Sequence, residues 1–416
     1  MYPLLDHIPW LLPHPRNSLL DWGAKLNHFQ RILLTEIAEL EQELKQCQDI
    51  VRPRLEKLWQ GKKKFVVEVT ELLQPLTRAK IAEKAIYDAL RDRPPQTQNL
   101  LSYEANVYRD WLWGEKENQL SAEAVGRQLP ADIDQLLVLG AGACRLACDV
   151  HIHHHIKHTV ATDINPLLLF AASNIIRGKD FSLTEFPLHP LNTDCIAVQQ
   201  TFSGLKTRLD NFSLVFADAA KPAFKPAAFD VVLTPWLIDI QPHELSRFLR
   251  QLNTYLPVGG LWVNFGSLVF NQRRDAYCYS INEITAIAEQ SGFRLYDITQ
   301  QTLPYLKSPY NAGHRVETVW TWRAEKIADT KPLEKTEILP DWILDLHKPI
   351  PKNDYFEQFI YTHRTWAILA AEVDGRSSIA QINKRFSKKN NIDVEEGERM
   401  LRQFFIDLHY QSQSAK

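Results

Sequence analysis

Cysteine is scarce in this sequence, and no two cysteines have the spacing of a zinc or redox motif. The 416 residues include 5 cysteines, and none of them forms a Cys-x-x-Cys pair. An odd, scattered set of cysteines argues against a disulfide framework and against a zinc site built from thiolates. We therefore expect the protein to work in the reducing environment of the cytoplasm.

Long apolar runs are absent as well. No stretch approaches the ~20 uninterrupted apolar residues that a helix needs to cross a bilayer. The apolar N-terminus is interrupted by prolines at positions 3, 9, 13 and 15. It also lacks the basic start and clean hydrophobic run of a signal peptide. The sequence therefore predicts a soluble protein without a membrane partner.

The third absence is an excess of charge of one sign. Lysine and arginine number 48 against 50 aspartates and glutamates, which gives a formal net charge of -2. A chain so balanced has no field that would collect polyanions. Nucleic acid is therefore not an expected partner. We interpret the one lysine cluster, residues 60–64, as a solvated turn.

Apolar material is plentiful: 45% of the residues are hydrophobic and 24% are charged. Such a chain folds into a globular protein, and its length predicts two or three domains at roughly 100 to 200 residues each. We expect a helical N-terminal region at 1–120, an α/β domain at 121–324, and a linker followed by a small, mainly helical domain at 325–416.

The N-terminal region shows helical periodicity. Apolar residues recur every three or four positions from Leu19 to Leu44, which predicts a helix from Ser18 to about Arg52, ended or kinked by Pro53. Further helical patterns follow at 65–73 and 76–90.

The period changes after Leu136. Short apolar runs are separated by stretches long enough for helices, an alternation that predicts a Rossmann-like parallel sheet with helices on both faces. A strand at 316–322 is expected to close the sheet in an antiparallel hairpin. The other expected strands are 136–140, 159–163, 213–218, 230–238 and 261–266.

The strongest local signal is a glycine turn between a strand and a helix, Gly140-Ala141-Gly142-Ala143-Cys144. Glycines at such a turn let the backbone approach a ligand and present helix N-terminal amides to it. The next expected strand ends in Asp163, whose carboxylate could accept hydrogen bonds from ribose hydroxyls. An ordinary tight turn beside a solvated aspartate is the alternative.

Two features favour S-adenosyl-L-methionine over a dinucleotide as the cofactor. Asp218 and Ala219 follow the third strand, where an acid can contact the adenine amino group. The turn at 256–260, Leu-Pro-Val-Gly-Gly, precedes a late strand. Both features are typical of class I methyltransferases, so we expect a Rossmann-like methyltransferase core.

Four segments together resemble the carnosine N-methyltransferase family. They are YRDWLWGEKEN at 108–118, GAGACRLACDV at 140–150, PWLIDI at 235–240 and VGGLWVNFGSL at 258–268. The resemblance covers roughly residues 100 to 323. It implies an S-adenosylmethionine-dependent N-methyltransferase that acts on an imidazole nitrogen of a histidine-containing dipeptide or peptide.

The resemblance also assigns cofactor contacts. Arg109 would bind the methionine carboxylate, and Asn106 falls where the family has a glutamine that contacts the cofactor. The alternative for Arg109-Asp110-Trp111 is a surface ion pair beside a core tryptophan. The complete expected set is Asn106, Arg109, Gly140, Gly142, Asp163, Asp218, Ala219 and Pro235.

Asp239 matches the substrate-binding aspartate of the family and is the expected catalytic residue. Methyl transfer from a sulfonium needs mainly a neutral nucleophile held at near-attack distance, and imidazole, with a pKa of about 6.5, is mostly neutral at neutral pH. A carboxylate at Asp239 could accept the second ring N–H, fix the tautomer and stabilise the cation formed. A helix N-cap before residues 242–244 is the alternative.

Other acceptor-site positions depart from the family. Asn271 stands at the position of a substrate-binding histidine, and His314 and Val316 occupy the positions of two tyrosines. Asn271 and His314 remain expected substrate contacts. The departures leave two alternatives open: a methyltransferase for a gene-encoded peptide, and an inactive scaffold that binds the cofactor.

The histidine-rich run at 151–158 does not predict a metal site. His151, His155 and His158 could share one helical face, but the run lies at the end of an expected helix, where cationic side chains suit the negative helix terminus, and no carboxylate completes a ligand set.

The C-terminal unit resembles a small winged-helix domain that binds leader peptides in pyrroloquinoline-quinone biosynthesis. The similarity lies in residues 362–386 and 393–408, with helical patterns at 355–373, 378–388 and 394–408. A peptide could add as a strand to such a domain; a purely structural cap is the alternative. A homodimer is also left open.

Overall fold

The structure is a computed structural model in two compact units, residues 1–333 and 334–416. It describes residues 2–13, 15–77, 99–241, 244–270, 275–331, 368–369, 372–374 and 376–414. No helix within these ranges is long and apolar enough to cross a bilayer.

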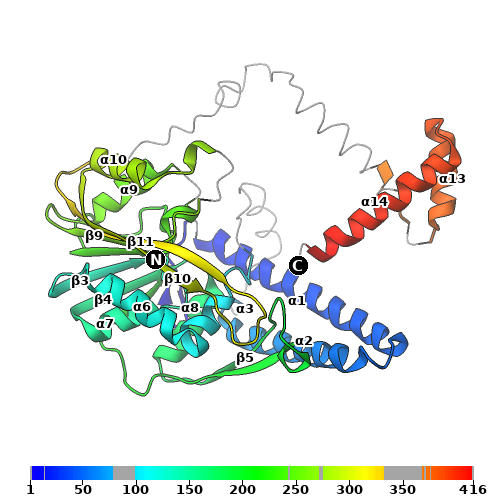
Figure 1. The fold of residues 1–416 in the computed structure, drawn as a ribbon, viewed down its shortest axis with the longest axis horizontal. Coiled ribbons are helices and arrows are strands. Elements are labelled where there is room, and N and C mark those ends of the chain that lie inside the picture. Colours follow the sequence, from blue (N-terminus) through cyan, green and yellow to red (C-terminus); the bar gives the residue numbers. More distant parts are fainter. Residues whose placement is uncertain are drawn as a thin grey trace. The chain divides into compact units, whose positions relative to one another are not determined.

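A seven-stranded sheet in the order β10-β11-β9-β8-β3-β4-β7 forms the centre of the first unit (Figure 1). Five strands are parallel, β11 runs antiparallel to β9, and β10 pairs with β11 in an antiparallel hairpin. The expected α/β fold and its closing hairpin are confirmed. The strands are β3 Asp132–Leu139, β4 His155–Asp163, β7 Phe212–Phe216, β8 Val231–Pro235, β9 Leu261–Gly266, β10 Phe293–Tyr305 and β11 Arg315–Lys326.

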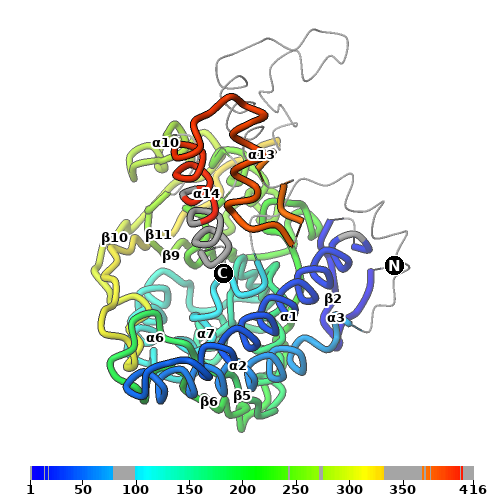
Figure 2. Tube along the Cα trace, turned by 90° about the vertical axis from the view of Figure 1, so that its right-hand side faces the viewer, coloured from blue at the N-terminus to red at the C-terminus, as the bar shows by residue number. Residues whose placement is uncertain are grey.

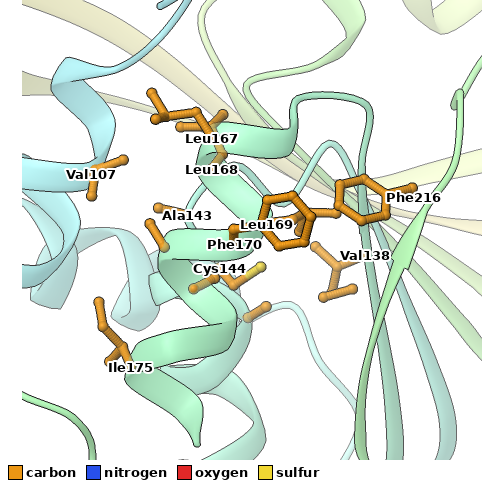
Figure 3. Packing of buried hydrophobic residues seen from close by; sticks show 14 of the residues in the cluster. Val107, Val138, Ala143, Cys144, Leu167, Leu168, Leu169, Phe170, Ile175 and Phe216 are labelled. Atoms are coloured by element: carbon orange, nitrogen blue, oxygen red, sulfur yellow. The ribbon is translucent and has the colours of Figure 1, made fainter. Parts of the chain in front are cut away.

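Helices bury both faces of the sheet, which is why the second half of β3, residues 136–139, is a continuous apolar run. Leu136 and Val138 pack in one cluster with residues of α7 (Arg145–His153) and α8 (Pro166–Ile176), as Figure 3 shows for part of this layer. Leu137 and Leu139 point the other way and pack with residues of α9 (Leu245–Tyr255) and α10 (Ile281–Gln290).

The order of the strands determines where a ligand can bind. From β3 the chain crosses first to β4 and later to β8 on the other side, so the direction of winding reverses between β3 and β8. In sheets of this type ligands bind at the carboxyl ends of the strands, beside such a reversal. The residues that follow β3, β4, β7 and β8 therefore define the edge where a site is expected.

Two long helices, α1 (Pro15–Gln46) and α2 (Arg52–Leu72), lie side by side in both views (Figures 1 and 2), followed by the short α3 (Gln74–Thr77). The expectation of a turn at 60–64 is wrong, because this lysine cluster lies inside α2. Gly61 is buried, and a Cβ added there would lie 2.5 Å from the Cβ of Ala197. Pro53 begins α2 rather than ending α1, as proline in a first turn can. The expected pattern at 76–90 falls mostly outside the described residues.

Several short elements were not expected from the sequence. β1 (Leu4–Leu5) pairs with β2 (Ile8–Pro9), and β5 (Phe181–Glu185) pairs with β6 (Val198–Phe202) around the 3-10 turn Thr193–Cys195. Before β3 the chain forms α5 (Ala105–Tyr108), a π-helix (Arg109–Trp113) and α6 (Glu115–Gly126). A further 3-10 turn spans Asp275–Tyr277.

The second unit contains α13 (Ile379–Asn390) and α14 (Val394–Ser414), which confirms two of its three expected helices. A capping box at Ser378 begins α13, and apolar side chains such as Phe386 and Leu401 pack together. Most of the expected helix at 355–373 lies outside the described residues. In the described part of this unit there is no strand.

Candidate active site

The glycine turn after β3 has a left-handed backbone. The φ angles of Gly140, Gly142 and Cys144 are 69°, 58° and 65°, a region that glycine enters at little cost and other residues rarely adopt. A Cβ at Gly140 would lie 2.7 Å from Cδ1 of Leu237, whereas one at Gly142 would have no atom within 4 Å. Gly140 therefore allows close packing, and Gly142 faces open space.

Asp163, at the end of β4, is bonded to this turn. One carboxylate oxygen accepts the Gly142 N–H at 2.9 Å, and the other accepts the Asn165 N–H at 2.9 Å. Burial raises the pKa of Asp163 to about 6, although these backbone donors oppose the shift. The side chain is thus an acceptor fixed against the backbone of the glycine turn.

The Arg109-Asp110-Trp111 segment packs directly on the same turn. The Trp111 indole N–H donates to the carbonyl of Ala143 at 2.8 Å, and Arg145 donates to the carbonyl of Asp110 at 3.0 Å. The segment is a π-helix, a form that occurs frequently at functional sites. These hydrogen bonds join residues more than thirty positions apart and bring together the segments 108–118 and 140–150, both of which resemble the family.

Arg109 is buried with two carboxylates. Its guanidinium contacts Asp110 at 2.6 Å and Glu117 at 3.2 Å, and its side chain is only 12% exposed. Burial by itself would lower the pKa of Arg109, but the two carboxylates outweigh that effect and raise it above its usual value. The surface ion pair considered as an alternative is therefore wrong. A ligand carboxylate would have to join a guanidinium that is already paired.

Asn106 lies one helical turn before Arg109. Its side-chain carbonyl oxygen is buried and has no hydrogen-bond partner within the described structure. Buried polar groups in folded proteins are nearly always satisfied, so an orphaned acceptor of this kind points to a donor from a ligand.

Asp218, Ala219 and Pro235 lie at the same edge of the sheet. Asp218 follows β7, and its carboxylate accepts the Ala220 N–H at 2.9 Å, while Ala219 is 9% exposed. Pro235 is the last residue of β8 and pairs with Phe265. Together with Gly140 and Asp163, these residues lie at the carboxyl ends of four neighbouring strands.

Asp239 lies just beyond β8 in the 3-10 turn Ile238–Ile240. The chain reaches it through Trp236, which has a left-handed φ of 50°. Ser267 donates its hydroxyl hydrogen to Asp239 at 2.8 Å, and Asp239 is 5% exposed. Burial raises the pKa of Asp239 to about 6, with a smaller contribution from the charge of Glu317. Glu244 is the N-cap residue of α9, so the alternative role of Asp239 as that cap is wrong.

Aromatic residues near Asp239 were not anticipated from the sequence. The Tyr305 ring centre lies 4.8 Å from that of Trp236, 4.6 Å from the Arg315 guanidinium and 5.9 Å from the Arg109 guanidinium. Tyr103 has a left-handed φ of 65°. Burial raises its pKa, and the charges of Tyr305, Asp239 and Asp163 raise it further. Trp236 lies inside one of the segments that resemble the family, so the sequence could have indicated it. Tyr103 and Tyr305 belong to no motif that would have predicted a place at the site.

The remaining expected acceptor residues are placed differently. His314 precedes β11 and is exposed, and Val316 on β11 is 60% exposed. Asn271 lies outside the described residues. Arg315 and Glu317, the neighbours of Val316 on β11, lie on the same face of the hairpin as Tyr305.

The histidine run does not share one helical face. α7 ends at His153, and His155 and His158 lie in β4, because the strand begins earlier than the apolar pattern indicated. Within the described ranges no three histidine, cysteine or acidic side chains are grouped as metal ligands would be. Cys144 and Cys148 are buried, which raises the pKa of both thiols and leaves them unsuited as nucleophiles.

Comparison with known proteins identifies one matching family model. The model described as carnosine N-methyltransferase matches residues 99–327, more than half of the chain. No curated protein is significantly similar to this chain in sequence.

Solved methyltransferase structures resemble the chain only distantly. The Haloferax volcanii complex of the Trm112 methyltransferase activator with a methyltransferase has 12% identity and a TM-score of 0.39, covering 56% of this chain and 100% of the other. An S-adenosylmethionine-dependent methyltransferase from Methanosarcina mazei has 13% identity and a TM-score of 0.35, covering 49% and 96%.

Proposed function

This chain belongs to the carnosine N-methyltransferase family and is an S-adenosylmethionine-dependent methyltransferase, and from this premise we propose that it methylates an imidazole nitrogen of a small histidine-containing compound. One observation carries the choice of acceptor: the buried carboxylate of Asp239, held by Ser267, at the sheet edge that also carries the glycine turn. A histidine dipeptide such as carnosine is the acceptor class we infer.

The residues present fit the cofactor. S-adenosylmethionine supplies a methyl group on a positively charged sulfur. Gly142 leaves open space beside backbone amides, Asp163 offers a fixed acceptor for ribose hydroxyls, and the orphaned oxygen of Asn106 is available to a donor. We propose that Asp218 and Ala219 contact the adenine, that Pro235 borders the site, and that Arg109 attracts the methionine carboxylate while paired with Asp110.

Asp239 is proposed to act on the acceptor rather than on the cofactor. A carboxylate that accepts one ring N–H leaves the other ring nitrogen with a free lone pair for attack. The same charge stabilises the imidazolium that forms as the methyl group arrives. Ser267 keeps the carboxylate in one orientation, so that its geometry is set before the acceptor binds.

Cofactor affinity is expected to depend on pH through Asp163. Ribose hydroxyls donate to the ionised carboxylate, and the pKa of Asp163 in the free protein is about 6. Protonation therefore competes with binding as the pH falls through that value. Titration calorimetry should show an affinity about tenfold weaker at about pH 5 than at about pH 7.

Two variants test whether Asp163 causes this pH dependence of cofactor affinity. Asp163→Asn should bind more weakly and with no slope below pH 6. Asp239→Asn is the matched control, because the pKa of Asp239 is also about 6 but its carboxylate is not proposed to touch the cofactor. A slope that persists in Asp163→Asn and disappears in Asp239→Asn would show the assignment to be wrong.

An acceptor panel tests the proposed function. The protein is incubated with S-adenosylmethionine and either carnosine, a short internal-histidine peptide, or a dipeptide whose imidazole is replaced by phenyl, and products are identified by mass spectrometry. We expect one added methyl on carnosine and none on the phenyl analogue. Methylation of the phenyl analogue would place the reaction elsewhere, and cofactor binding without any methylated imidazole would contradict the proposal.

Delivery of a gene-encoded peptide by the second unit has less support. The described part of that unit holds the helices α13 and α14, and no feature of these two helices identifies a peptide site. Nothing in the described site favours an inactive scaffold over an enzyme.

A further inference from the structure

The hairpin of β10 and β11 extends past the carboxyl edge of the sheet. β9 ends at Gly266, which pairs with Trp320, so residues 315–319 of β11 pair with β10 alone (Figure 1). The carboxyl edge is the one that carries Asp239. The free part of the hairpin therefore lies at the edge of the sheet that carries the proposed acceptor site.

The register determines which side chains of the hairpin face inward. Tyr305 pairs with Arg315, and Leu303 pairs with Glu317. Directly paired residues lie on the same face of an antiparallel pair. Tyr305 and Leu303 are 9% and 2% exposed, while Val316, on the opposite face, is 60% exposed. Arg315 and Glu317 thus occupy the inner face.

Arg315 is held in place yet open to solvent. Its guanidinium carbon lies 4.6 Å from the Tyr305 ring centre, and its Nε lies 3.5 Å from Oε1 of Glu317. Its side chain is 67% exposed, against 15% for Glu317. Among the described residues Glu317 is its ion-pair partner, and that contact is made through Nε, so the terminal NH₂ groups can meet a ligand.

The surroundings connect this arginine to the acceptor site. The Tyr305 ring beneath Arg315 packs on Trp236, which precedes Asp239 by less than one helical turn. Glu317 is close enough to Asp239 for its charge to raise the pKa of that carboxyl. The inner face therefore carries Glu317 and the guanidinium of Arg315, and its Tyr305 ring connects it through Trp236 to the turn that holds Asp239.

We propose that Arg315 binds a carboxylate of the methyl acceptor, so that the enzyme prefers imidazole compounds with a free carboxylate over the same compounds without one. This inference rests on the proposed function. A guanidinium pairs with a carboxylate through two parallel hydrogen bonds and is the side chain best suited to this task. Asp239 and Glu317 would repel that carboxylate, which favours the orientation with the imidazole at Asp239.

Two acceptors that differ only in this group provide the test. Carnosine and its C-terminal amide share the imidazole and the amine. For the wild-type protein we expect kcat/KM to be about 10 to 100 times higher for carnosine than for its amide, because the amide cannot form the charge-assisted contact with Arg315. In Arg315→Gln the ratio should fall to about one, with most of the loss in KM for carnosine.

Arg323→Gln is the matched control. Arg323 lies on the same strand, about 26 Å further along at ~3.3 Å per residue, and pairs with Asp297 at 2.9 Å. This variant should keep the wild-type preference. Calorimetry with S-adenosylmethionine should give the same affinity for wild type and both variants, which shows that the cofactor site is intact.

The outcomes separate the two proposals. If wild type methylates both acceptors equally well, Arg315 has no role in selection, while the proposed function stands. If Arg315→Gln lowers turnover of both acceptors by the same factor, the residue acts on the fold of the site and the inference is wrong. If no imidazole compound is methylated although the cofactor binds, the proposed function fails, and this inference with it.

Discussion

Asp239→Asn is expected to lower kcat/KM for methyl transfer by about 100-fold while the affinity for S-adenosylmethionine stays unchanged. The amide has nearly the same shape but no negative charge, so it would not stabilise an imidazolium. It also presents a donor as readily as an acceptor, so it would not select one ring tautomer. Steady-state kinetics with carnosine and calorimetry with the cofactor measure the two effects separately.

Two further variants make this result specific. Ser267→Ala removes the hydroxyl that donates to Asp239 at 2.8 Å, and should give a smaller loss of about tenfold because the charge remains. Asp230→Asn changes an aspartate at the opposite end of β8, where the carboxylate accepts the Gln135 N–H at 2.8 Å, and should leave kcat/KM unchanged. Wild-type kcat/KM in Asp239→Asn, with cofactor still bound, would show that this carboxylate does not act on the acceptor.

Gly142→Ala is expected to weaken S-adenosylmethionine binding by about 100-fold, or about 2.7 kcal/mol at 1.36 kcal/mol per decade. The new methyl group meets no protein atom within 4 Å, so the fold accommodates it. It occupies the space that we assign to the cofactor, however, and keeps the ligand from the backbone amides. Titration calorimetry measures the affinity, and thermal unfolding measures the cost to the fold.

Gly259→Ala is a closely matched control. Gly259 also has a positive φ, 86°, and a Cβ there also meets no atom within 4 Å, but it lies in the turn before β9. Each alanine should cost about 1 to 2 kcal/mol of stability for its left-handed backbone. Only Gly142→Ala should lose cofactor affinity. Equal affinity losses in both variants would mean that backbone strain, and not ligand contact, explains the effect.

The sheet could be predicted from the sequence because its strands are buried on both faces. Strands β3, β4, β7, β8 and β9 each contain a short, mostly apolar run, and these runs are separated by stretches long enough for helices. The glycine turn follows from the left-handed backbone that Gly140 and Gly142 adopt. Helix ends were less accurate. The charge of the lysine cluster in α2 favoured a solvated turn. In the structure the cluster is helical, and its Gly61 allows a loop to pack closely.

Part of the candidate site could not be predicted, for physical reasons. The pairing of Trp111 with Ala143 depends on tertiary packing, and a π-helix has no clear sequence pattern. The inner face of the hairpin depends on register, and a shift of one residue exchanges Val316 for Glu317 at the site. Family resemblance directed attention to His314 and Val316, whereas the structure places Arg315 and Glu317 on the face shared with Tyr305.

Transfer of an isotope-labelled methyl group from S-adenosylmethionine to carnosine, followed by NMR of the product, tests the central proposal most directly. The signal identifies the atom that carries the new methyl group. We expect the label on an imidazole nitrogen in wild type, and about 100-fold slower labelling of the same atom in Asp239→Asn. Label on the amine or the carboxylate, or no transfer by a protein that binds the cofactor, would contradict it.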